Sequence, residues 1–241
     1  MPYIEGFLTP VPGHRRDDYV AHANAAFAIL RDVGVTRLVE AWGEDVPRGT
    51  VNDLWGAVDA QAGEAVVFSW FEYPDRATRD AASERMRTDP RMEALGAGMP
   101  FDMRRMIWGG FRVVSDAGVT TETAGFVDGV VLPLSRDADA AYRDHAAALA
   151  PVFLDHGARR VVDTAADDVP AGETTDFHRA VLTQAGEAPA FGWIEWPSRA
   201  ARDQGWGAVM ADARMTGAAP PPYDGKRMAF GGFSVLLDLR A

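Results

Sequence analysis

The chain has 241 residues, 47% of them apolar, with a formal net charge of −11 and no cysteine. The acidic surplus repels nucleic-acid phosphates, and the lack of cysteine excludes disulfides, thiolate nucleophiles and zinc sites built on cysteine. Because no apolar run approaches the ~20 residues that cross a bilayer and the amino terminus does not resemble a signal peptide, we expect a cytoplasmic protein without a membrane or nucleic-acid partner.

The first part of the chain alternates predicted strands and helices. Apolar runs bounded by proline or glycine predict strands at residues 3–9, 35–42, 65–73 and 104–114, with a short strand at 54–58. One helix is expected to begin at Asp17 or Asp18 and to end at Gly34. A second helix is expected to follow Pro74, with Asp75 as its cap.

The same series of residues returns in the second part of the chain. His22 and Glu72, for example, recur 123 positions later as His145 and Glu195, and near the carboxyl end the offset becomes 122. Self-similarity over such a long period indicates a duplication. We therefore expect a first repeat at residues 1–115, a linker at 116–124 and a second repeat at 125–241.

Each repeat has the element order β-α-β-β-α-β, which is that of a ferredoxin-like unit. A single unit has helices on one face of an antiparallel sheet and leaves the other face uncovered. We therefore predict an α+β protein in which two tandem ferredoxin-like units pack sheet to sheet as a pseudo-dimeric α/β barrel. The chain would be a monomer with this internal pseudo-dimer, or a homodimer.

Several short motifs support this organisation. They are Val-Phe-Ser-Trp at 67–70, Asp-Pro-Arg-Met at 89–92, Asp-Asp-Val-Pro at 167–170, Pro-Ser-Arg-Ala with Arg-Asp at 197–203, and Asp-Gly-Lys-Arg-Met with Gly-Gly-Phe at 224–233. With these motifs the chain resembles the domain-of-unknown-function family DUF1428, once per copy and over nearly its whole length. The resemblance implies a small bacterial member of the dimeric α/β-barrel superfamily and brings no established activity. Members are typically single-copy, so a fused pair is a departure.

The third strand of each repeat carries the candidate site. Successive side chains of a strand point to opposite faces, and one face is identical in the two copies. We expect this face to line a pocket between the sheets, where four aromatic residues bind a small molecule: Phe68, Trp70, Phe191 and Trp193.

Glu72 and Glu195 lie on the same face and are candidate acid–base residues. A carboxyl group beside an indole in an apolar pocket has a raised pKa, which suits it to proton transfer. The alternative is that the tryptophans are core anchors and that each glutamate lies in water or pairs with an arginine.

His22 and His145 are the histidines that match between the copies. Each could act as a general base, or could be a hydrogen-bonded residue at the edge of the core. Neither metal-ligand spacing nor a phosphate-binding loop is present, so we expect no metal and no cofactor. Glu5 and Asp128 keep open a rival fold, a paired-βαβββ metalloenzyme of the glyoxalase type.

Three functions follow from the sequence. The first is binding of a small-molecule ligand between the repeats. The second is cofactor-independent acid–base catalysis by Glu72 or Glu195, and the third is a non-catalytic role in association with partners. Whether the space between the sheets is hollow or filled distinguishes them.

Overall fold

The computed structural model describes residues 2–119, 123–217 and 219–241, and these residues form one closed barrel with helices outside it. The strands of the first half are β1 (Tyr3–Pro12), β2 (Arg37–Asp45), β3 (Glu64–Tyr73) and β4 (Ile107–Gly118). Those of the second half are β5 (Phe126–Ser135), β6 (Arg160–Asp168), β7 (Glu187–Trp196) and β8 (Ala229–Arg240). The order around the barrel is β1-β3-β2-β8-β5-β7-β6-β4.

Every strand pair of the barrel is antiparallel. Within each half the order is that of a ferredoxin-like sheet, and the halves join where β2 pairs with β8 and β4 pairs with β6. The predicted α+β pseudo-dimeric barrel is therefore confirmed. The second repeat covers the sheet face that a single unit leaves open.

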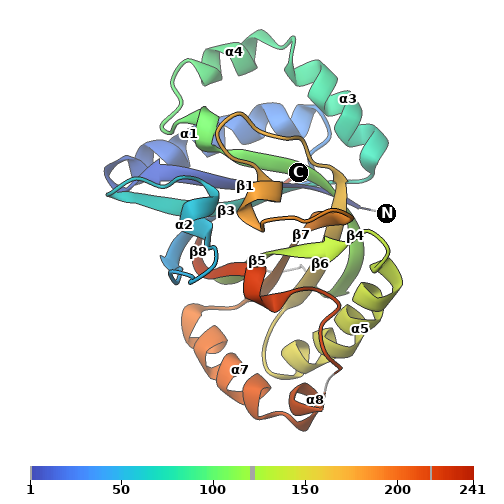
Figure 1. Ribbon diagram of the computed structural model, residues 1–241. Coiled ribbons are helices and arrows are strands. Elements are labelled where there is room, and N and C mark those ends of the chain that lie inside the picture. Colours follow the sequence, from blue (N-terminus) through green and yellow to red (C-terminus); the bar gives the residue numbers. More distant parts are fainter. Residues whose placement is uncertain (1, 120–122, 218) are drawn as a thin grey trace.

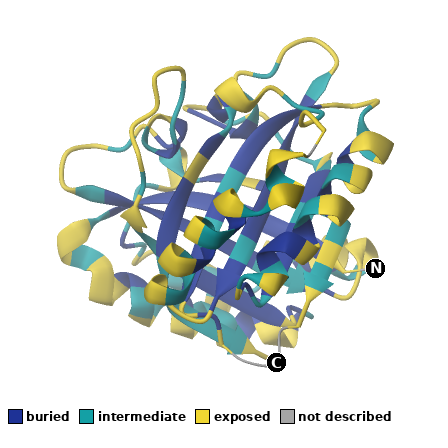
Figure 2. Ribbon diagram, turned by 90° about the horizontal axis from the view of Figure 1, so that it is seen from below, coloured by how far each residue is buried: buried dark blue, intermediate teal, exposed yellow. Residues whose placement is uncertain are grey.

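The long helices lie on the outer faces of the two sheets (Figure 1), whereas one short helix in each half packs into the apolar cluster of the barrel interior, through Leu54 and Ala57 or through Phe177 and Ala180. In the first half the helices are α1 (Arg16–Asp32), α2 (Leu54–Ala57), α3 (Arg76–Met86), α4 (Pro90–Gly96) and the 3-10 turns η1 (Gly13–Arg15) and η2 (Met103–Arg105). In the second half they are α5 (Asp139–Asp155), α6 (Phe177–Ala180), α7 (Arg199–Ala211), α8 (Ala213–Thr216) and η3 (Gly225–Arg227). Figure 2 shows buried strands inside and exposed helix surfaces outside, so the fold has two buried layers: the barrel interior and the helix–sheet interfaces.

Local capping explains where the long outer helices begin. Asp75 accepts a hydrogen bond of 2.8 Å from the backbone N–H of Thr78, and Ser198 accepts one of 3.2 Å from Ala201. Both caps satisfy amide groups that have no partner within the helix, as the sequence predicted. The first helix differs from expectation: α1 begins at Arg16, without a side-chain cap.

Two other predicted elements need correction. Residues 54–58, expected as a short strand, form helix α2, because Asp53 caps it by accepting a 2.7 Å hydrogen bond from Gly56 N–H. The last strand was expected at 104–114, but β4 runs to Gly118 and pairs there with β6 of the other half. The start of the predicted linker is thus part of the barrel, while its residues 120–122 lie outside the described chain.

Candidate functional site

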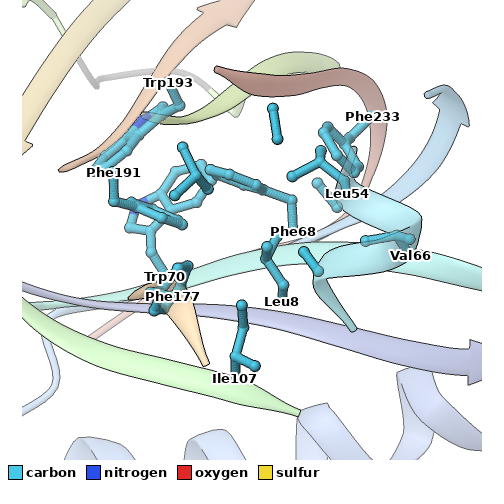
Figure 3. Packing of buried hydrophobic residues seen from close by; sticks show 14 of the residues in the cluster. Leu8, Leu54, Val66, Phe68, Trp70, Ile107, Phe177, Phe191, Trp193 and Phe233 are labelled. Carbon is cyan, nitrogen blue, oxygen red and sulfur yellow. The ribbon is translucent and has the colours of Figure 1, made fainter. Parts of the chain in front are cut away.

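The repeated face of the third strands points into the barrel and fills it. Phe68 and Phe191 stack with ring centroids 4.4 Å apart, and Trp70 and Trp193 stack at 4.3 Å. Their side chains are 0–1% exposed and join one apolar cluster with residues of both halves (Figure 3). The space predicted to hold a ligand is therefore occupied by the four rings themselves.

Glu72 and Glu195 lie at the end of this stack, in a cluster of charges. Each accepts a hydrogen bond from the indole Nε1 of its own strand, Trp70 to Glu72 at 3.1 Å and Trp193 to Glu195 at 3.0 Å. Arg37 and Arg160 each contact both carboxylates. Of the two roles considered for these glutamates, the structure shows the pairing with arginine.

A cavity of about 480 Å³ lies instead on the outer face of the second sheet, under α5 and α7. Its lining is mainly apolar and aromatic. The lining residues come from β5, β6, β7, α5, α7, α8, the segment before β8 and the start of β8: Asp128, Gly129, Val130, Leu132, Tyr142, His145, Ala146, Leu149, Ala150, Phe153, Val161, Val162, Asp163, Trp193, Ile194, Arg202, Trp206, Met215, Tyr223, Met228, Phe230 and Gly231. This volume is in the range of small-molecule sites.

Asp163 on β6 is the carboxyl group in the wall of this cavity that lacks a cationic partner among the described residues. Its Oδ1 accepts a 3.0 Å hydrogen bond from the buried phenol of Tyr142 on α5. Burial raises the pKa of Asp163 to about 6, and the Tyr142 hydrogen bond opposes that rise only in part. Asp163 nevertheless keeps part of its surface exposed toward the cavity. It can therefore accept or donate a proton near neutral pH.

His145 and Tyr223 complete the polar part of the wall. The imidazole of His145 packs edge-on against Tyr223 at 5.8 Å, and Tyr142 packs edge-on against the same ring at 6.2 Å. Burial lowers the pKa of His145, so the ring is neutral at neutral pH. Burial and the charge of Asp163 raise the pKa of Tyr223. The group is a set of neutral donors and acceptors beside one carboxyl.

A second carboxylate, Asp128 on β5, is fully engaged by its neighbours. Its Oδ2 accepts hydrogen bonds from the indoles of Trp196 at 2.8 Å and Trp206 at 2.7 Å, and its Oδ1 accepts one from Arg202 at 2.8 Å. This cluster fixes α7 against the sheet. The positive charge of Arg202 is compensated by the carboxylates that it contacts, so it is not free to pair with a ligand in the cavity.

The first half holds the corresponding residues in a more tightly filled arrangement. Tyr19 donates a 2.6 Å hydrogen bond to Glu40, the counterpart of Tyr142 and Asp163. Glu40 is 6% exposed and also bonds with Ser69, and burial raises its pKa to about 7. At position 69 the second half has Gly192, so the carboxyl there has no hydroxyl neighbour from β7.

Larger side chains also fill the outer face of the first sheet. Phe7, Phe27 and Phe71 stand where the second half has Val130, Ala150 and Ile194. The rings of Phe7 and Phe71 pack at 4.7 Å, and Phe27 and Phe71 belong to the same apolar cluster. The cavity of the second half is thus lined by smaller residues at these three places. At three others it is lined by larger ones, since Leu149, Phe153 and Trp206 stand where the first half has Ala26, Leu30 and Ser83.

The predicted site residues divide between these two environments. The barrel interior and its charged end hold Phe68, Trp70, Phe191, Glu72 and Glu195. Trp193 belongs to the interior cluster and also lines the cavity, whereas His145 lines the cavity alone. His22 lies in the first half against Phe101 at 6.2 Å, and burial lowers its pKa. The sequence analysis missed Asp163 and Tyr223; the signal for both was that they differ from their counterparts Glu40 and Phe101.

Glu5 and Asp128, the two residues that left a paired-βαβββ metalloenzyme open, are hydrogen-bonded to other side chains. Glu5 pairs with Arg79 at 3.0 Å and accepts a hydrogen bond from Tyr73, and Asp128 is bound as described above. Within residues 2–119, 123–217 and 219–241, no group of three or more metal-ligating side chains is assembled. The ferredoxin-like order of each half is not that of a paired-βαβββ protein.

Comparison with known proteins identifies one family in both halves of the chain and relatives that are about as long as one half. The sequence pattern of the family described as "Protein of unknown function (DUF1428)" matches residues 2–103 and 125–225. "Uncharacterized protein YbaA" of Escherichia coli (strain K12) and that of Shigella flexneri are each 47% identical over 116 residues, which is 48% of this chain and 99% of the relative. No described helix is long and apolar enough to pass through a membrane.

Solved structures show the same fold over the whole chain. One, titled a "putative monooxygenase" from Fusobacterium nucleatum subsp. nucleatum ATCC 25586, has a TM-score of 0.58 and 9% identity, covering 99% of this chain and 94% of that one. Another "putative monooxygenase", from Lactobacillus acidophilus NCFM, has a TM-score of 0.55 and 9% identity, covering 99% and 96%. At such identities the similarity concerns the fold alone.

Proposed function

This chain belongs to the DUF1428 family, as two tandem copies, and from that premise we propose that it binds a small, mainly apolar molecule in the cavity of its second half. The observation that carries the proposal is Asp163. Its carboxyl group faces an apolar cavity of about 480 Å³ without a cationic partner among the described residues. Apolar walls with a few convergent polar groups are typical of small-molecule sites.

The comparison between the halves supports this choice of site. Apolar side chains around unfilled space lose packing contacts, and three positions that line this partly open cavity are smaller than in the first half. Phe27, for example, is replaced by Ala150, and Phe71 by Ile194. A gene duplication starts with identical copies, so the difference in filling arose afterwards. We infer that the second half serves binding and the first half mainly supports the barrel.

The test is to give the second half the residues of the first. The double variant Ala150→Phe/Ile194→Phe fills the cavity, and Phe71→Ile in the first half is the matched control. Equilibrium dialysis with 2-naphthol, a neutral bicyclic probe, measures binding. We expect saturable binding of one probe per wild-type chain, an affinity at least about tenfold lower in the double variant, and an unchanged affinity in the control. Absence of saturable binding to the wild type would refute the proposal, as would equal affinity in the filled variant.

A second candidate function, proton transfer to and from the bound molecule, is favoured by the pKa of Asp163. A carboxyl group that titrates at about 6 is ionised enough at neutral pH to accept a proton and weakly acidic enough to return it. The fold also occurs in proteins titled putative monooxygenases, which is a likeness of fold and supports no particular reaction. Unlike Glu72 and Glu195, Asp163 has no ion pair with an arginine among the described residues.

Isotope exchange distinguishes this function from binding alone. With 2-tetralone in heavy water, the C–H bond beside the carbonyl would break, its proton would pass to the Asp163 carboxylate, and the electron pair would move onto the carbonyl oxygen as an enolate. Reversal would return a deuteron from the exchanged carboxyl. We expect exchange above the buffer rate in the wild type and loss of that excess in Asp163→Asn. Exchange at the buffer rate while 2-tetralone is bound would leave binding as the sole function.

A further inference from the structure

The charges around the cavity indicate which ligands it accepts. We propose that the site selects neutral molecules carrying a hydrogen-bond donor, such as a hydroxyl group, and rejects carboxylates and other anions. This inference rests on the proposed function and specifies its ligand class. It depends on the arrangement of four polar residues: Asp163, Tyr142, Asp128 and Arg202.

The first step concerns the free acceptor. Oδ1 of Asp163 is occupied by the Tyr142 hydroxyl, while no hydrogen bond of the described residues involves Oδ2. Asp163 is partly exposed, and it lines the cavity. Oδ2 keeps accessible surface, so a ligand that covers it removes its water, which is costly unless the ligand supplies a hydrogen bond. A ligand hydroxyl or N–H directed at Oδ2 would satisfy it.

The second step concerns the missing positive charge. Arg202 is the cationic side chain among the lining residues, and its guanidinium contacts Asp128, Asp45 and Asp203. His145 adds no charge at neutral pH because burial lowers its pKa. An anionic ligand would therefore meet the Asp163 carboxylate in a medium of low dielectric constant without a cation to compensate it. Like charges in such surroundings repel strongly.

The third step concerns the counterpart in the first half. There the same acceptor is satisfied from within the protein: Glu40 bonds with both Tyr19 and Ser69. Gly192 replaces Ser69, and a Cβ built on it would lie 3.7 Å from Oδ1 of Asp163. The second half thus lacks the hydroxyl group that the first half supplies on this strand. A ligand hydroxyl directed at Oδ2 would give the Asp163 carboxyl group the second hydrogen bond that Glu40 receives from Ser69.

The experiment compares 2-naphthol with 2-naphthoate, two probes of similar size that differ in a neutral donor and an anionic acceptor. Dialysis at pH 7.5 gives the ratio of their affinities for the wild type and for Asp163→Asn. Asparagine keeps the shape and can still accept the Tyr142 hydrogen bond, but it removes the charge. Glu40→Gln is the matched control in the first half.

We expect the wild type to favour 2-naphthol by at least about tenfold, and Asp163→Asn to weaken 2-naphthol while strengthening 2-naphthoate. Partial unfolding would weaken both probes, so responses of opposite sign cannot come from it. Glu40→Gln should leave the ratio unchanged. A ratio that is the same in wild type and Asp163→Asn overturns the ligand class and leaves the proposed binding function standing. Failure of both probes to bind the wild type overturns the proposed function, and the ligand class with it.

Discussion

The phenol of Tyr142 donates a hydrogen bond to Asp163 at 3.0 Å, and the two residues link helix α5 to strand β6 at the wall of a cavity. Tyr19 and Glu40 repeat this link in the first half at 2.6 Å. The two pairs occupy equivalent positions of a duplicated chain, yet Glu40 is buried and doubly bonded, whereas Asp163 is partly exposed. One chain therefore contains a packed and a hollow version of the same arrangement.

The first prediction concerns the pH dependence of stability and the variant Glu40→Gln. Burial raises the pKa of Glu40 from 4.5 to about 7, so the folded state holds its proton over a range in which the unfolded state has lost it. This contribution to stability is fully present below pH 4.5 and is lost as the pH rises to about 7. The loss is on the order of 3 kcal/mol. Glutamine cannot ionise, so the variant should escape this loss.

Urea unfolding between pH 4.5 and 7.5 checks this prediction. The free energy of unfolding of Glu40→Gln, relative to wild type, should rise steadily across that interval and then level off. Asp163→Asn is the companion variant. Its free energy of unfolding relative to wild type should rise over a lower pH range, which ends near pH 6. A difference between variant and wild type that stays constant with pH would show that Glu40 has an ordinary pKa.

The second prediction concerns Gly192→Ser. A Cβ at this position would lie 3.0 Å from the carbonyl oxygen of Val162 and 3.4 Å from a methyl of Val130, so the side chain fits with a small local shift. Its hydroxyl would occupy the space beside Asp163 that we assign to the ligand. We expect the affinity for 2-naphthol to fall by about tenfold with little loss of stability. Calorimetric titration measures it, and an affinity equal to that of the wild type would place the probe elsewhere.

The third prediction separates the barrel core from the binding site. Phe68 is fully buried and stacked on Phe191, so Phe68→Ala should lower the free energy of unfolding by roughly 3–5 kcal/mol. Because Phe68 does not line the cavity, the folded variant should bind 2-naphthol with the affinity of the wild type. Urea unfolding and dialysis give the two values. Loss of binding in a folded Phe68→Ala protein would mean that the ligand binds between the sheets and not in the cavity.

The fourth prediction uses the duplicated arginines at the end of the barrel. Arg37 binds Glu195 and Asp238, which are 1% and 0% exposed, whereas its counterpart Arg160 binds Glu72 and Asp116, which are 12% and 29% exposed. Removing Arg37 takes the nearest cation from two buried carboxylates and leaves them the longer contacts to Arg160 and Arg240, so Arg37→Met should cost about 3 kcal/mol. Arg160→Met should cost less, since water can hydrate its partners. Equal losses in urea unfolding would mean that solvent reaches both carboxylate pairs alike.

The architecture was predictable because it depends on features that both copies retain. The offset between Glu72 and Glu195 revealed the duplication, and strand alternation placed Phe68 and Trp70 on the face that points into the barrel. The end of β4 was not predictable, since residues up to Gly118 are held by pairing with β6 of the other half. Segment 54–58 was too short for the spacing of its apolar residues to distinguish a strand from a turn of helix.

The candidate site was less predictable, and the reason is physical. Identical residues in the two copies marked the packed core, while the cavity lies where the copies differ, at positions such as Ala150 and Ile194. A small residue in a sequence does not show whether its neighbours close around it. Similarly, the pKa of Asp163 depends on burial between α5 and β6, which brings together residues 21 positions apart.

The most direct test of the account is a crystal structure of the protein with 2-naphthol bound. The account predicts the naphthalene ring between α5 and the second sheet, with its hydroxyl within hydrogen-bonding distance of Oδ2 of Asp163. An ordered ring at any other place on the protein, or an unchanged cavity at a saturating concentration of the probe, would contradict it.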